Sequence, residues 1–386
     1  SVISLVSYVL TKVAVTVYAG GLVFQQVFGI KELWGIDFFW IAAIGLVVLT
    51  ALYTIFGGMK SVLYTSVLQT PILLLGSLII LVLGFKELGG WDEMMRVCGA
   101  VTVNDYGDTM TNLIRSNDDA NFPWLGALIG SAIIGFWYWC TDQFIVQRVL
   151  SGKNEKEARR GTIFGAYLKL LPVFLFLIPG MIAFALHQKY IGAGGEGFLP
   201  MLANGTANAD AAFPTLVAKL LPAGVKGLVV CGILAALMSS LASLFNSSAM
   251  LFTIDFYKRF RPETPEKKLV GIGQIATVVI VILGILWIPI MRSVGDVLYT
   301  YLQDVQSVLA PGIAAAFLLG ICWKRTSAQG GMWGLIAGMI IGLTRLGAKV
   351  YYSNAGEVAD STFKYLFYDM NWLFFCGWMF LFCIIV

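Results

Sequence analysis

Small and hydroxyl residues line one side of an apolar segment between Cys231 and Met250, which reads CGILAALMSSLASLFNSSAM. At 3.6 residues per turn, these residues fall near a single face of a helix. They are Ala236, Ser239, Ser240, Ser243, Asn246 and Ser247. Such a stripe in a membrane-length helix either lets a second helix approach closely or offers oxygens to a dehydrated cation. The residue types alone leave both interpretations open.

Charged and amide side chains interrupt other apolar segments. Lys169 lies about eight residues inside its segment, roughly 12 Å at 1.5 Å per residue. A lysine at the bilayer centre costs about 2.5–3.5 kcal/mol, so it either meets a partner or water or extends to the cytoplasmic interface. Lys12 lies equally deep in the first segment, and extension to the interface is favoured there. Gln303 can donate to and accept from a hydroxylated ligand, or it can bond a neighbouring helix.

Aromatic residues cluster in the stretch FWYWCTDQFIVQR, as Trp137, Tyr138 and Trp139. They lie too deep for the interfacial belt that usually explains Trp and Tyr in membrane proteins. A flat aromatic face at this depth stacks on a sugar ring or closes a gate, although core packing is the commoner explanation for a single ring. Asp142 follows nearer the cytoplasmic end, where Arg148 and water are expected to satisfy it.

The elements that position these groups are membrane helices. Hydrophobic residues make up 58% of the 386 residues and charged residues 12%, and the mean hydropathy is +0.81. These values lie far from those of a soluble domain. We predict an all-α polytopic membrane protein with ten transmembrane helices in a single transporter domain, 1–386. The helices are expected at 1–29, 36–56, 62–85, 124–149, 161–187, 224–257, 269–290, 295–321, 331–350 and 371–386.

Loop charges orient these helices. The connections at 57–60, 148–160, 258–268 and 322–330 carry thirteen Lys or Arg against four Glu, whereas the opposite connections are longer and acidic. The positive-inside rule places the basic set in the cytoplasm and starts the first helix there. The net charge of +4 therefore reports topology and not nucleic-acid binding. We expect a multi-pass protein of the plasma or inner membrane.

The cysteine and histidine content excludes several classes of protein. Five of the six cysteines lie in or beside predicted helices, so they do not form a disulfide framework. A single histidine, His187, excludes an ordinary zinc or haem site. The sequence contains no glycine-rich phosphate-binding loop of the Walker type, so we do not expect transport to be coupled directly to ATP. We expect a transporter and not an enzyme.

Pro311-Gly312 is expected to break or bend its helix.

At these residues the chain resembles the sodium:solute symporter family, and within it the sodium/glucose cotransporter branch. The resemblance rests on ALYTIFGGMKSVLYT, FWYWCTDQFIVQRVLSGKN, GAYLKLLPVF, AALMSSLASLFNSSAMLFTIDFY, LQDVQSVLAPGIAAAFLLGICWKR and GGMWGLIAGMIIGLTR, in the order of that family. The repeat Gly334, Gly338 and Gly342 is weak by itself because close helix packing explains it equally well. The resemblance implies a LeuT-type inverted repeat of five plus five helices with extra flanking helices. It also implies that the sequence starts at the third core helix, with further helices expected at both ends.

The resemblance assigns roles to single residues. The carbonyl of Ala236 and the hydroxyls of Ser239 and Ser240 match the sodium site of the family.

The sugar site is assigned in the same way. Lys169 and Gln303 match residues that hydrogen-bond sugar hydroxyls. Tyr138 matches the aromatic inner gate that stacks on the sugar, with Trp139 beside it. Tyr299 stands where the family places an outer-gate aromatic residue.

Two positions depart from the family pattern. Ser66 stands where the family commonly has an Asp that is linked to a second sodium site or to sodium exit, which argues against a two-sodium stoichiometry. Gly135 replaces a polar side chain near the sugar, which leaves the identity of the sugar open.

The resemblance implies a symporter that imports a sugar, such as glucose or galactose, with Na⁺ as the coupling ion. Its partners are then the sugar, sodium and the lipid bilayer. A carrier of myo-inositol or another small polar solute is the alternative within the same family. A sodium-conducting channel or a transporter-like sensor is the alternative from another class.

Overall fold

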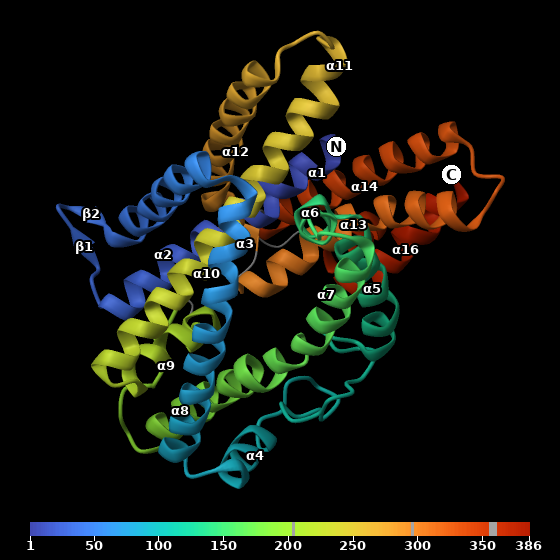
Figure 1. The fold of residues 1–386 in the computed structure, drawn as a ribbon. Helices are drawn as coiled ribbons and strands as arrows, with labels where there is room; N and C mark the ends of the chain where they lie inside the picture. The colour runs from blue at the N-terminus through green and yellow to red at the C-terminus, as the bar shows by residue number, and fades with distance from the viewer. Residues whose placement is uncertain (203–204, 295–296, 355–360) are drawn as a thin grey trace. The chain divides into compact units, whose positions relative to one another are not determined.

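The computed structural model describes the backbone of residues 1–386 except 203–204, 295–296 and 355–360 (Figure 1). Side chains are described except at those positions and at 53, 55–62, 65, 68, 291–294 and 354. Within the described residues, helices form nearly all regular structure, and a two-stranded antiparallel sheet is the rest. The prediction of a helical protein is confirmed. The chain forms two compact units: unit 1 contains Ser1–Val15, Asn112–Gln147 and Ser247–Val386, and unit 2 contains Thr16–Thr111 and Arg148–Asn246.

Unit 1 is built around α13, which contacts α5, α14 and α16. A core of buried apolar residues from α5, α13 and α16 includes Ile133, Ala310, Leu373 and Cys376. Its elements are α1 (Val2–Ser7), η1 (Tyr8–Val13), α5 (Trp124–Phe136), η2 (Trp137–Thr141), η5 (Leu251–Tyr257), α11 (Lys258–Phe260), α12 (Glu266–Val294), α13 (Leu298–Cys322), α14 (Ala328–Asn354), α15 (Thr362–Lys364), η6 (Tyr365–Asp369) and α16 (Trp372–Ile385). The η elements of this unit are π-helices.

Unit 2 is built around α8, which contacts α3, α4 and α9. Ile80, Ile182, Leu186 and Leu216 are fully buried in its core. Its elements are β1 (Glu32–Leu33), β2 (Ile36–Asp37), α3 (Phe38–Leu88), α4 (Trp91–Gly99), α7 (Glu155–Leu168), η3 (Val173–Leu177), α8 (Ile178–Gly192), η4 (Ala209–Ala211) and α9 (Ala212–Leu220). Three helices, α2 (Ala14–Phe28), α6 (Gln143–Leu150) and α10 (Ala223–Met250), contribute residues to both units.

A tight hairpin fixes where α3 begins. Trp34 (φ 56°) and Gly35 (φ 76°) form the turn between β1 and β2. Positive φ at both central residues is the turn geometry that matches the twist of paired strands. The Asp37 carboxylate then accepts the Phe39 N–H at 2.9 Å and caps the first turn of α3.

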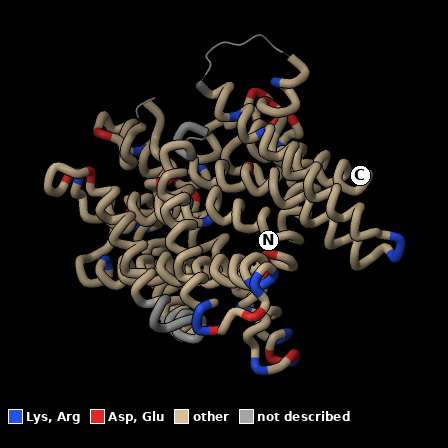
Figure 2. Tube along the Cα trace, turned by 90° about the horizontal axis from the view of Figure 1, so that it is seen from above, with Lys and Arg blue, Asp and Glu red and all other residues tan. Residues whose placement is uncertain are grey.

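Eight helical stretches of the described chain are long and apolar enough to cross a membrane, or nine if Thr362–Asp369 (α15 and η6) and α16, bent by 107°, form one span. Figure 2 shows Lys, Arg, Asp and Glu mainly at helix ends and in loops. The prediction of a multi-pass membrane protein is confirmed. The expected helices at 36–56 and 62–85 are joined in α3, apart from Ile36–Asp37, which form β2. This helix has 51 residues and appears as two limbs in Figure 1. At 1.5 Å per residue, the length along the path of α3 is about 77 Å, which is more than one crossing of a bilayer needs.

Of the break or bend expected at Pro311, the break does not occur. The helix α13 continues through this residue from Leu298 to Cys322. Interruptions occur elsewhere: the π-helix η2 ends at Asp142, whose backbone is extended (φ −77°, ψ 116°), and α7 ends before Lys169. A proline, Pro172, lies directly before η3 at the second of these interruptions, whereas the first, at Asp142, has no proline beside it.

The glycine repeat of α14 lies in a tightly packed region of unit 1. A Cβ atom at Gly338 would lie 2.9 Å from Cys383 Sγ, and one at Gly342 would lie 2.8 Å from the carbonyl oxygen of Val308. Neighbouring helices therefore occupy the space that a side chain would need. Close helix packing, the simpler explanation of this repeat, accounts for it.

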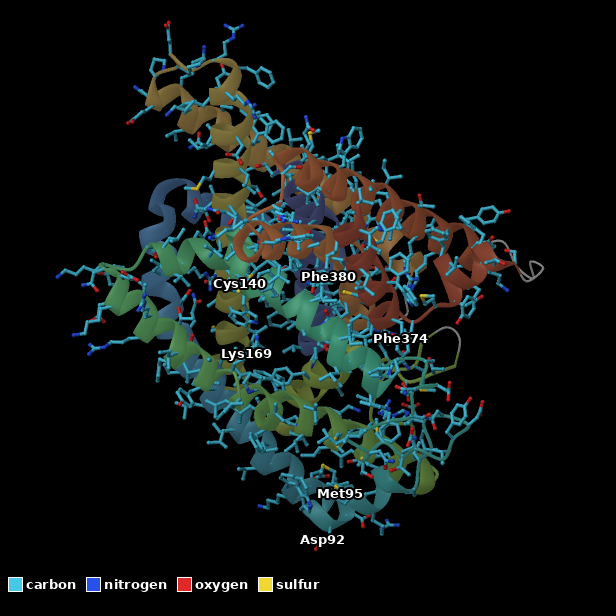
Figure 3. All side chains as sticks on the ribbon, turned by 90° about the vertical axis from the view of Figure 1, so that its right-hand side faces the viewer. Asp92, Met95, Cys140, Lys169, Phe374 and Phe380 are labelled. Carbon is cyan, nitrogen blue, oxygen red and sulfur yellow. The ribbon has the colours of Figure 1, made fainter. Side chains whose placement is uncertain are left out.

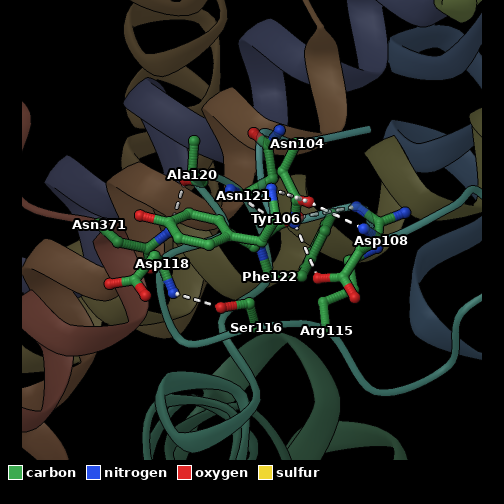
Figure 4. Close-up of polar contacts among 11 residues, drawn as sticks. Asn104, Tyr106, Asp108, Arg115, Ser116, Asp118, Ala120, Asn121, Phe122 and Asn371 are labelled. Atoms are coloured by element: carbon green, nitrogen blue, oxygen red, sulfur yellow. Dashed lines mark hydrogen bonds and ion pairs between the residues drawn. The ribbon is translucent and has the colours of Figure 1, made fainter. Parts of the chain in front are cut away.

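The predicted outer loop before α5 is ordered by its own polar groups (Figure 4). The Asp119 carboxylate accepts the N–H groups of Asn121 at 2.9 Å and Phe122 at 2.8 Å. The Asn371 amide donates to the carbonyl oxygen of Ala120 at 2.6 Å, so the loop is tied to the start of α16.

Two positions test both the packing and the orientation of the outer segments by thiol labelling. Cys98, in α4, is fully buried, and burial raises the pKa of its thiol, which lowers the thiolate fraction that reacts. Leu113 is 98% exposed. We expect a membrane-impermeant maleimide, added outside intact cells, to label a Leu113→Cys variant and to leave Cys98 unlabelled at pH 7.5. Labelling of Cys98 as fast as the introduced thiol would contradict the packing, and an unlabelled introduced thiol would contradict the orientation.

Candidate functional site

Ser239, one residue of the small-residue stripe of α10, contacts α3 within unit 2. Ser239 is buried, and its Oγ lies 2.6 Å from the Oγ of Ser66. A Cβ atom at Gly232 would lie 3.1 Å from Ile72 Cγ2, so the two helices approach closely. The stripe therefore packs and also brings oxygens together. Ser66, the departure from the family pattern, is the residue that meets the predicted sodium ligand.

The rest of the stripe has separate partners. Ala236 and Ser240 are half-buried. Ser243 is fully buried, and its hydroxyl accepts a hydrogen bond from Arg148 Nη2 at 2.6 Å. Among the described residues, no group of three or more His, Cys, Asp or Glu could hold a metal ion. A cation at this stripe would therefore be bound by hydroxyl and carbonyl oxygens, which are suitable ligands for a hard ion.

Two expectations about charged groups are wrong. Lys12 does not extend to an interface: it is 9% exposed and forms an ion pair with Asp142. Asp142 in turn is held by Lys12 and by the Tyr8 hydroxyl, which donates at 2.8 Å, and not by Arg148. A partner about 130 residues away in the sequence explains why no local pattern revealed the pair.

The predicted gate residues lie in the π-helix η2. Trp137 is buried in the unit 1 core, Tyr138 is half-buried, and Trp139 is 50% exposed. The Tyr138 and Trp139 rings meet edge to face with centroids 5.2 Å apart. Trp137 therefore belongs to the core, Tyr138 packs against that core, and Trp139 is the exposed ring of the cluster.

Gln303 and Tyr299 lie one turn apart on α13. Gln303 Nε2 donates to the Tyr299 hydroxyl at 2.8 Å, whereas Gln303 Oε1 is buried and has no hydrogen-bond partner among the described residues. A buried acceptor without a donor costs about 1–3 kcal/mol, which a donating ligand would recover. Tyr299 is 52% exposed, and its ring centroid lies 6.4 Å from that of Phe122.

Lys169 lies at a discontinuity between α7 and η3 and is labelled in Figure 3. Its side chain is exposed, and the α-helix ends just before it, at Leu168. Lys169 and Ser239 belong to unit 2, whereas Tyr138 and Gln303 belong to unit 1. Their convergence at one depth, which the sequence suggested, stays a prediction.

Sequence reasoning missed a buried charge cluster in unit 1. The Asp304 carboxylate forms ion pairs with Lys349 Nζ at 2.6 Å and with Arg345 Nη2 at 3.3 Å. Arg345 is fully buried and also donates to the carbonyl oxygens of Leu366 at 3.3 Å and Met370 at 2.7 Å. The spacing of Arg345 and Lys349, one turn apart in an apolar helix, was the available signal.

Comparison with known proteins supplies the family. The family model described as the sodium:solute symporter family matches residues 1–338. Human sodium/myo-inositol cotransporter 2 is 37% identical over 357 residues, 90% of this chain and 52% of that protein. Mouse sodium/glucose cotransporter 4 is 37% identical over 364 residues, 92% of this chain and 52% of that protein. The chain thus spans about half the length of these two relatives.

A solved structure supports the fold. It is the substrate-bound, outward-open state of a Na⁺-coupled sialic acid symporter, and it matches with a TM-score of 0.68 and 21% identity over 100% of this chain and 72% of that one. Sheep sodium/glucose cotransporter 1 is 37% identical over 402 residues, 100% of this chain and 60% of that protein. From the family model and these relatives, the chain belongs to the sodium:solute symporter family.

Proposed function

We propose that the protein is a sodium-coupled secondary active symporter that imports a sugar, most simply a hexose such as glucose or galactose. In this proposal residues 1–386 form one transporter domain with ten transmembrane helices and a LeuT-type repeat of five plus five. Membership of the symporter family over residues 1–338 is the observation that carries it. Relatives named for glucose transport support the substrate class.

The coupling ion is sodium, held by the carbonyl of Ala236 and the hydroxyls of Ser239 and Ser240. The Oγ atoms of Ser66 and Ser239, 2.6 Å apart, support this assignment because they place two neutral oxygens at a buried point of α10. A sodium ion that crosses a potential of 100 mV contributes about 2.3 kcal/mol to uptake. Sodium favours an outward-facing arrangement, and this arrangement binds sugar. The size of the effect is limited by the difference between the affinities of sodium for the outward-facing and inward-facing states.

The sugar is bound by Lys169, Gln303, Tyr138 and Trp139, with Tyr138 as the inner gate and Tyr299 as the outer gate. The buried and unpartnered Oε1 of Gln303 supports this role, since a sugar hydroxyl is the donor it lacks among the described residues. The exposed ring of Tyr299, bonded to the same amide, supports a gate beside it.

Ser239→Ala tests the sodium site. We expect the sodium concentration for half-maximal uptake to rise about tenfold, because one oxygen ligand worth roughly 1.4 kcal/mol is lost. Ser77→Ala is the matched control: this buried hydroxyl bonds the Leu73 carbonyl of its own helix at 2.8 Å. Equal sodium dependence in both variants would remove Ser239 from the site.

Gln303→Leu tests the sugar site. It removes the unpartnered acceptor together with the amide that donates to Tyr299, and it leaves an apolar side chain of similar size. We therefore expect the KM for sugar to rise about tenfold. The measurement is initial uptake of labelled glucose at saturating sodium. An unchanged KM would indicate that Gln303 bonds only Tyr299.

A myo-inositol carrier is the second candidate, supported by the human relative named for that solute at the same 37% identity. Competition separates the two candidates. If myo-inositol inhibits the uptake of labelled glucose at a lower concentration than galactose does, the second candidate is favoured.

A further inference from the structure

The Lys12–Asp142 ion pair is not used by the proposed sodium or sugar sites. Both side chains are nearly inaccessible, at 9% and 1% exposure. A buried ion pair is often no more stabilising than well-packed apolar residues, because both charges lose their hydration. Stability alone therefore does not explain why the charges lie here, and their neighbours suggest another role.

Asp142 holds the chain on both sides of the point where η2 ends. Its own N–H donates to the Trp137 carbonyl at 3.1 Å, which closes the last turn of the π-helix. Its carboxylate accepts the Phe144 N–H at 3.1 Å, at the start of α6. The Tyr8 hydroxyl donates to the same carboxylate and accepts the Phe144 N–H. The backbone N–H of Asp142 thus fixes the chain before the interruption, and its carboxylate fixes the chain after it.

Lys12 lies among aromatic rings from η1, η2 and α6. Its Nζ is 4.2 Å from the Phe144 ring centroid, 4.9 Å from that of Tyr8 and 5.3 Å from that of Tyr138. An ammonium within about 6 Å of a ring face is attracted to it, more strongly away from water. One cation therefore contacts the ring proposed as the inner gate and the carboxylate that ends its helix.

The π-helix η1, which carries Lys12, is itself held from the other side. The Tyr301 hydroxyl donates to the Leu10 carbonyl at 2.8 Å and accepts the Trp287 Nε1–H at 2.6 Å. The backbone of η1, two residues before Lys12, is consequently attached to α13 and α12 through a short chain of hydrogen bonds that does not involve η2.

We propose that Lys12 and Asp142 are positioning residues that set the orientation of η2 and with it the ring of Tyr138. This proposal rests on the proposed function for its transport consequences, since Tyr138 contacts sugar only there. The conformational part stands on the ion pair, the extended backbone at Asp142 and the ring contacts, and it is tested separately.

Cys140 provides a native reporter of η2. It lies in this π-helix and its side chain is exposed. The experiment uses the full-length protein in detergent and measures the alkylation rate of Cys140 by mass spectrometry of its peptide. The test variant is Lys12→Met with Asp142→Leu, which replaces both charges by apolar groups and leaves neither partner as a buried charge without its counter-ion. We expect its Cys140 rate to differ from wild type by at least about fivefold, and Lys12→Arg to change the rate less because it keeps the cation near the rings and the carboxylate.

Two comparisons make the result specific. Lys349→Met removes a cation from the other buried cluster of unit 1 and should leave the Cys140 rate unchanged. In proteoliposomes the double variant should raise the KM for glucose about tenfold and leave the sodium dependence unchanged. A wild-type Cys140 rate in the double variant would overturn the positioning role. A changed Cys140 rate without sugar transport by the wild-type protein would overturn the proposed function and leave the positioning role standing.

Discussion

Asp304→Leu is expected to lower the free energy of unfolding by about 3–5 kcal/mol, because it leaves Arg345 and Lys349 without their counter-charge. Asp304 and Arg345 are almost fully buried, and Lys349 is 21% exposed. The guanidinium carbon of Arg345 also lies 4.1 Å from the Phe375 ring centroid, which offers no negative charge in place of the lost carboxylate. Thermal unfolding of the purified protein in detergent measures the effect as a lower melting temperature.

The control for Asp304 separates a lost charge from a lost pair. A triple variant with Arg345→Leu and Lys349→Met added should recover most of the melting temperature, since no charge of the cluster is then uncompensated. Glu155→Leu breaks an ion pair in which Glu155 and Arg159 are 78% and 76% exposed, and it should change the melting temperature little. An Asp304→Leu protein as stable as wild type would contradict the cluster.

Gly342→Ala is expected to destabilise the protein by about 1–3 kcal/mol or more, the usual range for overpacking. The added methyl would lie 2.4 Å from Val308 Cγ1 and 2.8 Å from the Val308 carbonyl oxygen. A side chain can change rotamer, but the backbone oxygen moves only if α13 moves with respect to α14. The melting temperature and the yield of monodisperse protein measure the effect.

Gly347→Ala is the matched control for Gly342. It lies in the same helix and has no atom within 4 Å of the position of its Cβ. Alanine is the better helix former by about 1 kcal/mol, so this variant should be as stable as wild type or more stable. The two substitutions therefore have opposite expected signs, and equal melting temperatures would show that Gly342 is not at a close contact.

Composition and periodicity predicted the helical membrane fold because a bilayer permits few alternatives to long apolar helices. Close helix packing at the Gly334–Gly342 repeat could also be predicted, since small residues at four-residue spacing share one face of a helix. The sequence did not reveal that Ser66 meets Ser239. That contact joins helices at positions 173 residues apart in the chain, and no local pattern encodes which helices become neighbours.

The buried charges show the same limit. An isolated Lys in an apolar segment is compatible with an interface position, and only its environment excludes this. Lys12 and Asp142 are separated by 130 residues, and the π-helices that bring them together have no sequence signature comparable to a glycine or a proline. The unpartnered Oε1 of Gln303 is also a property of packing among the described residues, and it adds physical support to a residue that resemblance had selected.

Uptake by the full-length protein in liposomes tests the central claim most directly. With an inward sodium gradient, we predict that labelled glucose accumulates above its equilibrium level and that a sodium ionophore abolishes the accumulation. The same uptake rate with potassium replacing sodium on both sides would contradict sodium coupling. A sodium current without any accumulated solute would identify a channel instead.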